Sequence, residues 1–194
     1  MRVGVFGGSF DPVHNAHLIV ARLALEQLQL DRVIFTVAAS QPHKLGRHAA
    51  TAAARLRMVE LAVAGIGEFV ADDRELRRPP PSFSVDTLRE LAAEVPGAEL
   101  VLIMGADVAR RFEAWRDPAG IRSLATLAVC ARAGSAAGGA VPGVPDGFAA
   151  VIDVPAMDIS STAIRARAVA GQSLAGWVPP SVADYIVASQ LYVE

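Results

Sequence analysis

The first forty residues contain two apolar runs separated by a helical pattern, and this order restricts the fold more than any other feature of the chain. The runs are MRVGVFG at 1–7 and RVIFTVAA at 32–39. Between them, HLIVARLALEQLQL at 17–30 repeats its apolar residues at helical spacing. A strand, a helix and a second strand in this order form a βαβ unit, whose two strands run parallel.

The same alternation continues along the rest of the chain. Further apolar runs predict strands at 68–73, 98–105, 126–132 and 149–154. Helical patterns predict helices at 51–65, 85–95, 106–115, 119–125, 161–170 and 180–189. The proline-rich stretch RRPPPSFS at 77–84, between the strand at 68–73 and the helix at 85–95, must be a loop. The sequence therefore predicts a Rossmann-like α/β fold, a doubly wound, mainly parallel sheet with helices on both faces.

Length and charge limit the classes of protein that fit. The 194 residues suit a single domain over 1–194, with a C-terminal helical part at about 160–194 packed on it. The net charge of -2 is less basic than a general nucleic-acid binder requires. Neither a signal peptide nor an apolar stretch of the roughly 18–20 residues that span a membrane is visible. We therefore expect a cytoplasmic protein without nucleic-acid or membrane partners. The sequence does not decide whether the protein forms a homo-oligomer.

Rare residue types are concentrated near the N-terminus. The lone lysine, the lone asparagine and all four histidines fall within one short part of the sequence: Lys44, Asn15, His14, His17, His43 and His48. Such clustering favours a functional site between residues 14 and 48.

Two glycines, Gly7 and Gly8, lie at the turn between the first predicted strand and the first predicted helix. In sheets of this kind ligands bind beyond the carboxyl ends of the strands, and glycine lets an anion approach the backbone amides. A tight turn without a ligand is the alternative. Next, Asp11-Pro12 predicts a helix start, with the aspartate as N-cap and the proline in the first helical position.

His14 and His17 would then lie on one face of that helix, near its positive N-terminus. A zinc site fits poorly, because the spacing is three rather than four and no cysteine cluster adds ligands. A dehydrogenase-type site also fits poorly, since the glycines read G-x-x-G-G and the second strand ends in VAASQ without an acid. Two histidines at a phosphate can donate hydrogen bonds to oxygens that gain charge. Polar residues at a helix start, without catalysis, remain the alternative.

The stretch GGSFDPVHNAH at 7–17 resembles the signature of the nucleotidylyltransferase superfamily. Four further motifs follow in the order and approximate spacing of the bacterial nicotinate-mononucleotide adenylyltransferase family. They are PHK at 42–44, PSFSVDTL at 81–88, GAD at 105–107 with Trp115 after it, and ISSTAIR at 159–165. The resemblance spans nearly the whole chain.

This resemblance implies an enzyme of NAD biosynthesis that transfers AMP from ATP to nicotinate mononucleotide, giving nicotinate adenine dinucleotide and pyrophosphate. The transfer would be in line, without a covalent intermediate, and Mg²⁺ would arrive on ATP rather than at a metal site of the protein. Other adenylyl- or cytidylyltransferases of the superfamily, acting on phosphopantetheine or nicotinamide mononucleotide, are the nearest alternatives. A non-catalytic nucleotide-binding protein is the alternative from another class.

The resemblance also implies three sets of site residues, which overlap. The catalytic residues would be His14, His17, Lys44 and Arg165. The ATP site would comprise Gly7, Gly8, Ser9, Phe10, His14, His17, Lys44, Ser160, Ser161, Thr162 and Arg165. The nicotinate mononucleotide site would comprise Ser84, Gly105, Asp107, Trp115 and Arg116.

Three positions depart from the family pattern. Ala16 stands where many relatives have glycine, Phe83 stands where tyrosine is usual, and the QPHK motif has one proline where a pair is common. We expect the 42–50 and 133–147 loops to move on substrate binding.

Overall fold

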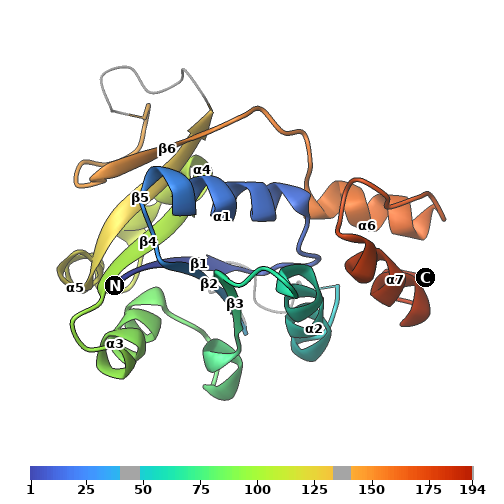
Figure 1. Cartoon of the computed structure of the whole chain (residues 1–194), viewed down its shortest axis with the longest axis horizontal. Helices are drawn as coiled ribbons and strands as arrows, with labels where there is room; N and C mark the ends of the chain where they lie inside the picture. The colour runs from blue at the N-terminus through green and yellow to red at the C-terminus, as the bar shows by residue number, and fades with distance from the viewer. Residues whose placement is uncertain (40–48, 133–140, 194) are drawn as a thin grey trace. The chain divides into compact units, whose positions relative to one another are not determined.

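The structure is a computed structural model, and it describes residues 1–39, 49–132 and 141–193 (Figure 1). Its strands are β1 (Arg2–Gly8), β2 (Arg32–Val37), β3 (Phe69–Asp72), β4 (Glu99–Gly105), β5 (Ala125–Arg132) and β6 (Ala150–Val154). Its α-helices are α1 (Asn15–Gln27), α2 (Ala52–Val63), α3 (Ser84–Glu94), α4 (Ala106–Ala109), α5 (Pro118–Leu124), α6 (Ser161–Val169) and α7 (Pro180–Ala188). Two short 3-10 helices are η2 (Arg74–Arg77) and η3 (Phe112–Ala114).

The strands form one six-stranded sheet in the order β3-β2-β1-β4-β5-β6. β4 runs parallel to β1 and to β5, and β6 runs parallel to β5. The chain therefore adds strands outward from β1 in one direction and from β4 in the other. This order confirms the predicted doubly wound α/β fold, and its switch point lies between β1 and β4.

The chain divides into two compact units. Unit 1 comprises Met1–Gly7, Val20–Ile34 and Phe83–Ala156, and unit 2 comprises Gly8–Ile19, Phe35–Ser82 and Met157–Glu194. The prediction of one domain over 1–194 stays a prediction.

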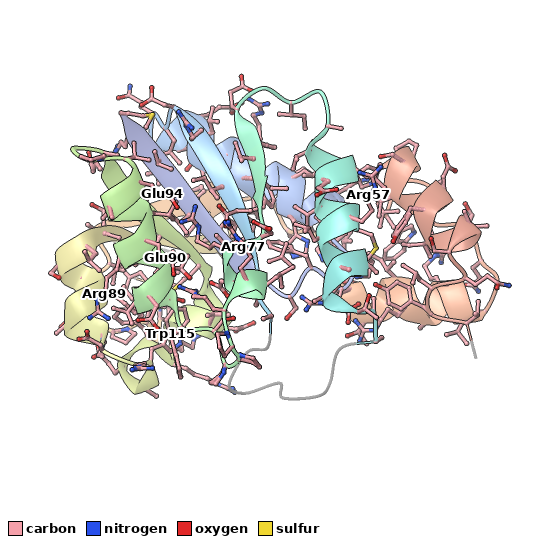
Figure 2. The ribbon with its side chains drawn as sticks, turned by 90° about the horizontal axis from the view of Figure 1, so that it is seen from below. Arg57, Arg77, Arg89, Glu90, Glu94 and Trp115 are labelled. Atoms are coloured by element: carbon pink, nitrogen blue, oxygen red, sulfur yellow. The ribbon has the colours of Figure 1, made fainter. Side chains whose placement is uncertain are left out.

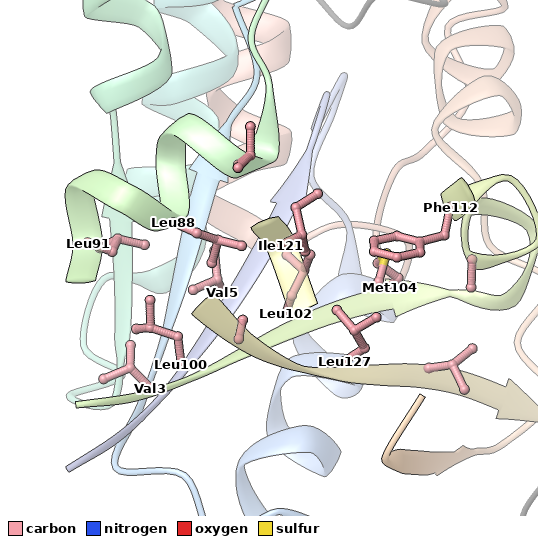
Figure 3. Packing of buried hydrophobic residues seen from close by; sticks show 14 of the residues in the cluster. Val3, Val5, Leu88, Leu91, Leu100, Leu102, Met104, Phe112, Ile121 and Leu127 are labelled. Atoms are coloured by element: carbon pink, nitrogen blue, oxygen red, sulfur yellow. The ribbon is translucent and has the colours of Figure 1, made fainter. Parts of the chain in front are cut away.

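Unit 1 has its core between the sheet and the helices α3 and α5 (Figure 3). Alternate residues of β1, β4 and β5 point into this core together with apolar residues of the two helices: Val3, Val5, Leu100, Leu102, Met104, Leu127, Leu88, Leu91 and Ile121. The intervening strand residues Val101 and Ile103 are buried as well. Figure 1 shows α1 and α3 on opposite sides of β1 and β4. Burial on both faces explains why these strands are apolar without alternation.

Unit 2 combines the end of β2 with β3, α2, α6 and α7. Three phenylalanine rings pack in series, with Phe35 centred 5.7 Å from Phe10 and 5.4 Å from Phe69. Helix α7 is joined to α2 by the Ser181 hydroxyl, which donates to the Leu61 carbonyl at 3.1 Å. The glycine turn, α2 and the two C-terminal helices thus share one compact unit.

Two predicted helices differ from the structure. Helix α1 begins at Asn15, not at Pro12, because the Asp11 carboxylate accepts from the amides of Ala49 and Ala50 instead of capping the helix. Asp11 and Pro12 lie in the preceding turn, and the peptide bond between them is cis. The predicted helix at 106–115 is divided into α4 and η3 by a bend around Arg111. In addition, the short helix η2 has no counterpart among the predicted elements. Within the described residues, every helix is too short or too polar to cross a bilayer.

Candidate functional site

The glycine turn after β1 is built around the ring of Phe10. A Cβ on Gly8 would lie 2.8–3.0 Å from three atoms of this ring, which is closer than real side chains pack. Phe10 itself has a left-handed backbone, with φ of 48°. Its ring meets the His17 ring edge-on, with 5.1 Å between centroids. Gly8 therefore brings Phe10 under the turn and against His17, while Gly7 is exposed in unit 1.

His14 and His17 come together at the start of α1. Their rings stack with 3.6 Å between centroids and 20° between planes. His14 occupies the N-cap position, since its carbonyl accepts from the His17 amide at 2.9 Å. The two residues are thus paired as predicted, although the helix begins at Asn15 rather than at Asp11-Pro12.

Hydrogen bonding and burial define the protonation of this pair. The His14 backbone N–H donates to Nδ1 of His17 at 3.2 Å, so the neutral His17 ring carries its proton on Nε2. Burial lowers the pKa of His14 from 6.5 to about 4. Burial, with a smaller contribution from the neighbouring His14, lowers the pKa of His17 well below its usual range. Both rings are therefore neutral hydrogen-bonding groups at neutral pH.

Two buried polar atoms of this region have no hydrogen-bond partner among the described residues. They are the Oγ of Ser9 and the Nδ1 of His14. Buried polar atoms are otherwise nearly always satisfied in folded proteins. A bound ligand with several oxygen atoms would supply the missing partners.

The N-terminus of α6 is joined to the same turn. Ser160 caps α6 by accepting from the Ala163 amide at 3.2 Å, and the Ser161 hydroxyl donates to the Pro12 carbonyl at 2.9 Å. Arg165 donates to the Asp11 carbonyl at 2.8 Å and lies 3.4 Å from the Thr162 hydroxyl. Unit 2 therefore brings the Asp11-Pro12 turn and ISSTAIR together. The anion site at this helix N-terminus stays a prediction.

Asp11 and Arg55 are functional candidates that the sequence analysis did not identify. The Asp11 carboxylate is buried and accepts from the amides of Ala49 and Ala50 at 2.8 and 3.2 Å. It therefore connects chain segments instead of capping α1.

Arg55 on α2 is only 1% exposed, and its guanidinium donates to the carbonyls of Ser9, Ala38 and Ala39 at 2.7, 2.8 and 3.3 Å. Burial lowers the pKa of Arg55, and this effect is opposed by the negative charge of Asp11. The sequence did contain a signal for the burial of Arg55. Arg55 precedes the buried Met58 and Val59 by three and four residues, and this spacing places the arginine on the apolar face of its helix.

The predicted nicotinate mononucleotide residues lie in unit 1, where two of them lie at the carboxyl end of β4. Gly105 is the N-cap of α4, and Asp107 lies in its first turn. The Asp107 carboxylate is 95% exposed and pairs with Arg110 at 2.5 Å. An exposed pair of this kind contributes little to stability, so Asp107 can exchange this partner for a ligand hydroxyl.

The remaining residues of that set gather around two aromatic rings. The Arg116 guanidinium lies 4.6 Å from the centre of the Phe83 ring, next to Ser84 at the start of α3. Phe83 therefore supports a cation at the position where the family usually has tyrosine. Trp115 is half-buried and packs 5.6 Å from the Phe112 ring. Figure 2 labels Trp115 together with Arg89 of α3, which pairs with Asp117 at 2.7 Å and so joins α3 to this loop.

Lys44 lies outside the described residues, as do parts of the 42–50 and 133–147 loops. Ala16 is buried, so its methyl group packs inside the protein. Among the described residues, no group of three or more histidine, cysteine or acidic side chains could hold a metal ion.

A comparison with protein families shows the family to which this chain belongs. The cytidylyltransferase-like family model matches residues 5–167, which is most of the chain. The chain therefore belongs to the cytidylyltransferase-like family, in agreement with its doubly wound sheet and its histidine-containing turn.

Individual relatives narrow this assignment. A protein of Thermus thermophilus, named "Probable nicotinate-nucleotide adenylyltransferase", is 46% identical over 99% of this chain and 100% of its own length. A protein of Thermomicrobium roseum with the same name is 39% identical over 98% of this chain and 91% of its own length. Within the family, the chain belongs to the nicotinate-nucleotide adenylyltransferases.

A solved structure shows the same fold at lower sequence similarity. The nicotinic acid mononucleotide adenylyltransferase of Plasmodium falciparum, complexed with NaAD, has a TM-score of 0.78 at 17% identity. The match covers 98% of this chain and 97% of that protein.

Proposed function

We propose that this protein transfers the AMP moiety of ATP to nicotinate mononucleotide, giving nicotinate adenine dinucleotide and pyrophosphate. The observation that carries the proposal is the stacked, neutral pair His14 and His17 beside the glycine turn, with Arg165 and the capped N-terminus of α6 on the same turn. This is a set of hydrogen-bond donors without an activated nucleophile. Such a set suits in-line transfer between two phosphates. A cytoplasmic location, where ATP is available, belongs to the proposal.

In this mechanism a phosphate oxygen of the mononucleotide attacks the α-phosphorus of ATP. The bond from that phosphorus to the bridging oxygen breaks, and pyrophosphate leaves with the electron pair. His17 would donate from Nε2 to the oxygens of the α-phosphate, because its Nδ1 is already an acceptor. Donors fixed in advance stabilise the charge that develops there.

Other residues would hold the leaving group. His14, Arg165 and the α6 amides near Ser160–Thr162 would bind the polyphosphate, and Lys44 would reach it as a further cation. We propose that Mg²⁺ enters as the ATP complex, bound by phosphate oxygens, which are the hard ligands that this ion prefers.

The acceptor would bind through residues of unit 1. The backbone amides near Ser84 and Arg116 would bind the nicotinate carboxylate, Trp115 would lie near the ring, and Asp107 would accept from ribose hydroxyls. Nicotinamide lacks the carboxylate charge, so such a site favours nicotinate.

A substrate panel tests the function directly. The purified protein is assayed for pyrophosphate release with ATP, Mg²⁺ and one of three acceptors: nicotinate mononucleotide, nicotinamide mononucleotide or phosphopantetheine. A second series replaces ATP with CTP, and a third series omits Mg²⁺. We expect the highest kcat/KM with ATP and nicotinate mononucleotide. Turnover only with phosphopantetheine or CTP would assign another transferase activity, and release from no pair would leave a binding protein.

The role of the histidine pair is tested by His17→Ala. We expect kcat to fall at least about tenfold, a loss of ~1.4 kcal/mol of transition-state stabilisation. Ile19→Ala, an exposed position on the same helix, is the matched control and should retain full activity. Unchanged turnover in a folded His17→Ala protein would remove the pair from the mechanism.

A further inference from the structure

Tyr192, which follows α7, is hydrogen-bonded to the turn that carries the histidines. Its hydroxyl donates to Oδ1 of Asp11 at 2.7 Å, across 181 positions of sequence. Both residues belong to unit 2. The C-terminal end of the chain is therefore in direct contact with the centre of the GGSFDPVHNAH motif.

The hydrogen bond between Tyr192 and Asp11 is strong, because its acceptor is a buried carboxylate. Asp11 is 5% exposed, and a hydrogen bond to a buried carboxylate is worth more than one between neutral groups. Burial, with the nearby Asp11, raises the pKa of Tyr192, so its hydroxyl keeps its proton at neutral pH and can donate it. The backbone of Tyr192 is left-handed, with φ of 63°, a conformation that a tyrosine adopts only when its surroundings hold it there.

Asp11 transmits this contact to the site. Its carboxylate also accepts from the amides of Ala49 and Ala50, and its carbonyl accepts from Arg165. It precedes His14 by only three residues. A change in the position of Asp11 therefore moves Arg165 and the histidine turn together.

We infer that Tyr192 is a positioning residue of the transfer site: its hydroxyl fixes Asp11, and Asp11 holds Arg165 and the histidine turn in the arrangement that binds the ATP phosphates. The inference rests on the function proposed above. Arg165 and the histidine turn bind the phosphates of ATP in the proposed function, so the effect of Tyr192 through Asp11 falls on ATP and not on the acceptor.

The test removes only the hydroxyl, by Tyr192→Phe. The two tyrosines of the chain supply a matched control, because Tyr185→Phe removes a hydroxyl from α7 without touching Asp11. A second control, Ser181→Ala, removes a different hydrogen bond that holds the C-terminal helix to α2. For each variant we measure kcat, KM for both substrates, Tm, and hydrogen exchange of the Ala49 and Ala50 amides.

For Tyr192→Phe we expect kcat/KM for ATP to fall roughly tenfold, with KM for nicotinate mononucleotide unchanged. We also expect faster exchange at the amides of Ala49 and Ala50, which share the Asp11 carboxylate with the tyrosine. Both controls should keep wild-type kinetics at a temperature well below Tm.

Three outcomes overturn the inference. They are wild-type kinetics in Tyr192→Phe, an equal rise in KM for both substrates, or an equal loss of kcat/KM for ATP in Ser181→Ala at a matched Tm. An inactive wild-type protein would instead refute the proposed function, while the exchange measurement would still report whether Tyr192 fixes Asp11.

Discussion

Burial of His14 predicts a loss of stability in mildly acidic solution, and its size follows from the structure. In the unfolded chain the imidazole has its ordinary pKa of 6.5, whereas in the folded protein burial lowers that pKa to about 4. Between these values the unfolded state binds a proton that the folded state does not. Stability is therefore full above pH 6.5 and falls as the pH decreases towards 4.

The magnitude comes from the difference between the two pKa values. At about 1.36 kcal/mol per pH unit, the whole range corresponds to about 3 kcal/mol in the free energy of unfolding. About 2 kcal/mol of this is lost between pH 7 and pH 5. His17 contributes in the same direction, because its pKa is also lowered.

Urea unfolding of the wild type and of His14→Gln at pH 7 and pH 5 measures this contribution. Titration of carboxylates is common to both proteins and cancels in the difference. We expect the wild type to lose about 2 kcal/mol more than the variant over this range. An equal loss in both proteins, or an NMR titration of His14 with a pKa near its ordinary value, would refute the assignment of a buried neutral ring.

Two further substitutions test how the turn is supported. In Gly8→Ala the new methyl group would collide with the Phe10 ring, so we expect a loss of about 1–3 kcal/mol in the free energy of unfolding and a lower kcat. Gly67→Ala, where a Cβ would meet nothing within 4 Å, is the control, and an equal effect of the two would contradict the packing argument. Arg55→Lys loses the planar group that serves three carbonyls, so we expect a loss of about 3 kcal/mol by urea unfolding. The exposed Arg57→Lys on the same helix should cost less than about 0.5 kcal/mol, and similar losses for the two would show that burial does not matter here.

Much of the fold could be predicted because the central strands are buried on both faces. The runs at 98–105 and 126–132 have few polar side chains, and the structure places β4 and β5 within one residue of them. Their order among helical segments defines a parallel, doubly wound sheet. The pairing order of the strands depends on contacts between distant segments, and only the structure provides it.

Local patterns failed where a tertiary contact outweighed them. Asp11 has the chemistry of an N-cap, yet its carboxylate serves Ala49, Ala50 and Tyr192 instead. A cap requires the side chain to return to its own helix, so the competing partners move the helix start to Asn15. The helical pattern at 106–115 is likewise interrupted, with Phe112 fully buried in the core of unit 1.

The sequence by itself determined the class of fold and the family, and it supplied the residue types of the proposed phosphate site, because these depend on local patterns and on motifs read in order. The tertiary structure decided how the site is held. The spacing of His14 and His17 predicted that they lie on one helix face, but not that their rings stack. The three carbonyls on Arg55 and the hydroxyl of Tyr192 on Asp11 are contacts between residues whose spacing in sequence carries no such information. Burial of these groups, which lowers the pKa of the histidines and makes each hydrogen bond costly to lose, exists only once the chain is folded.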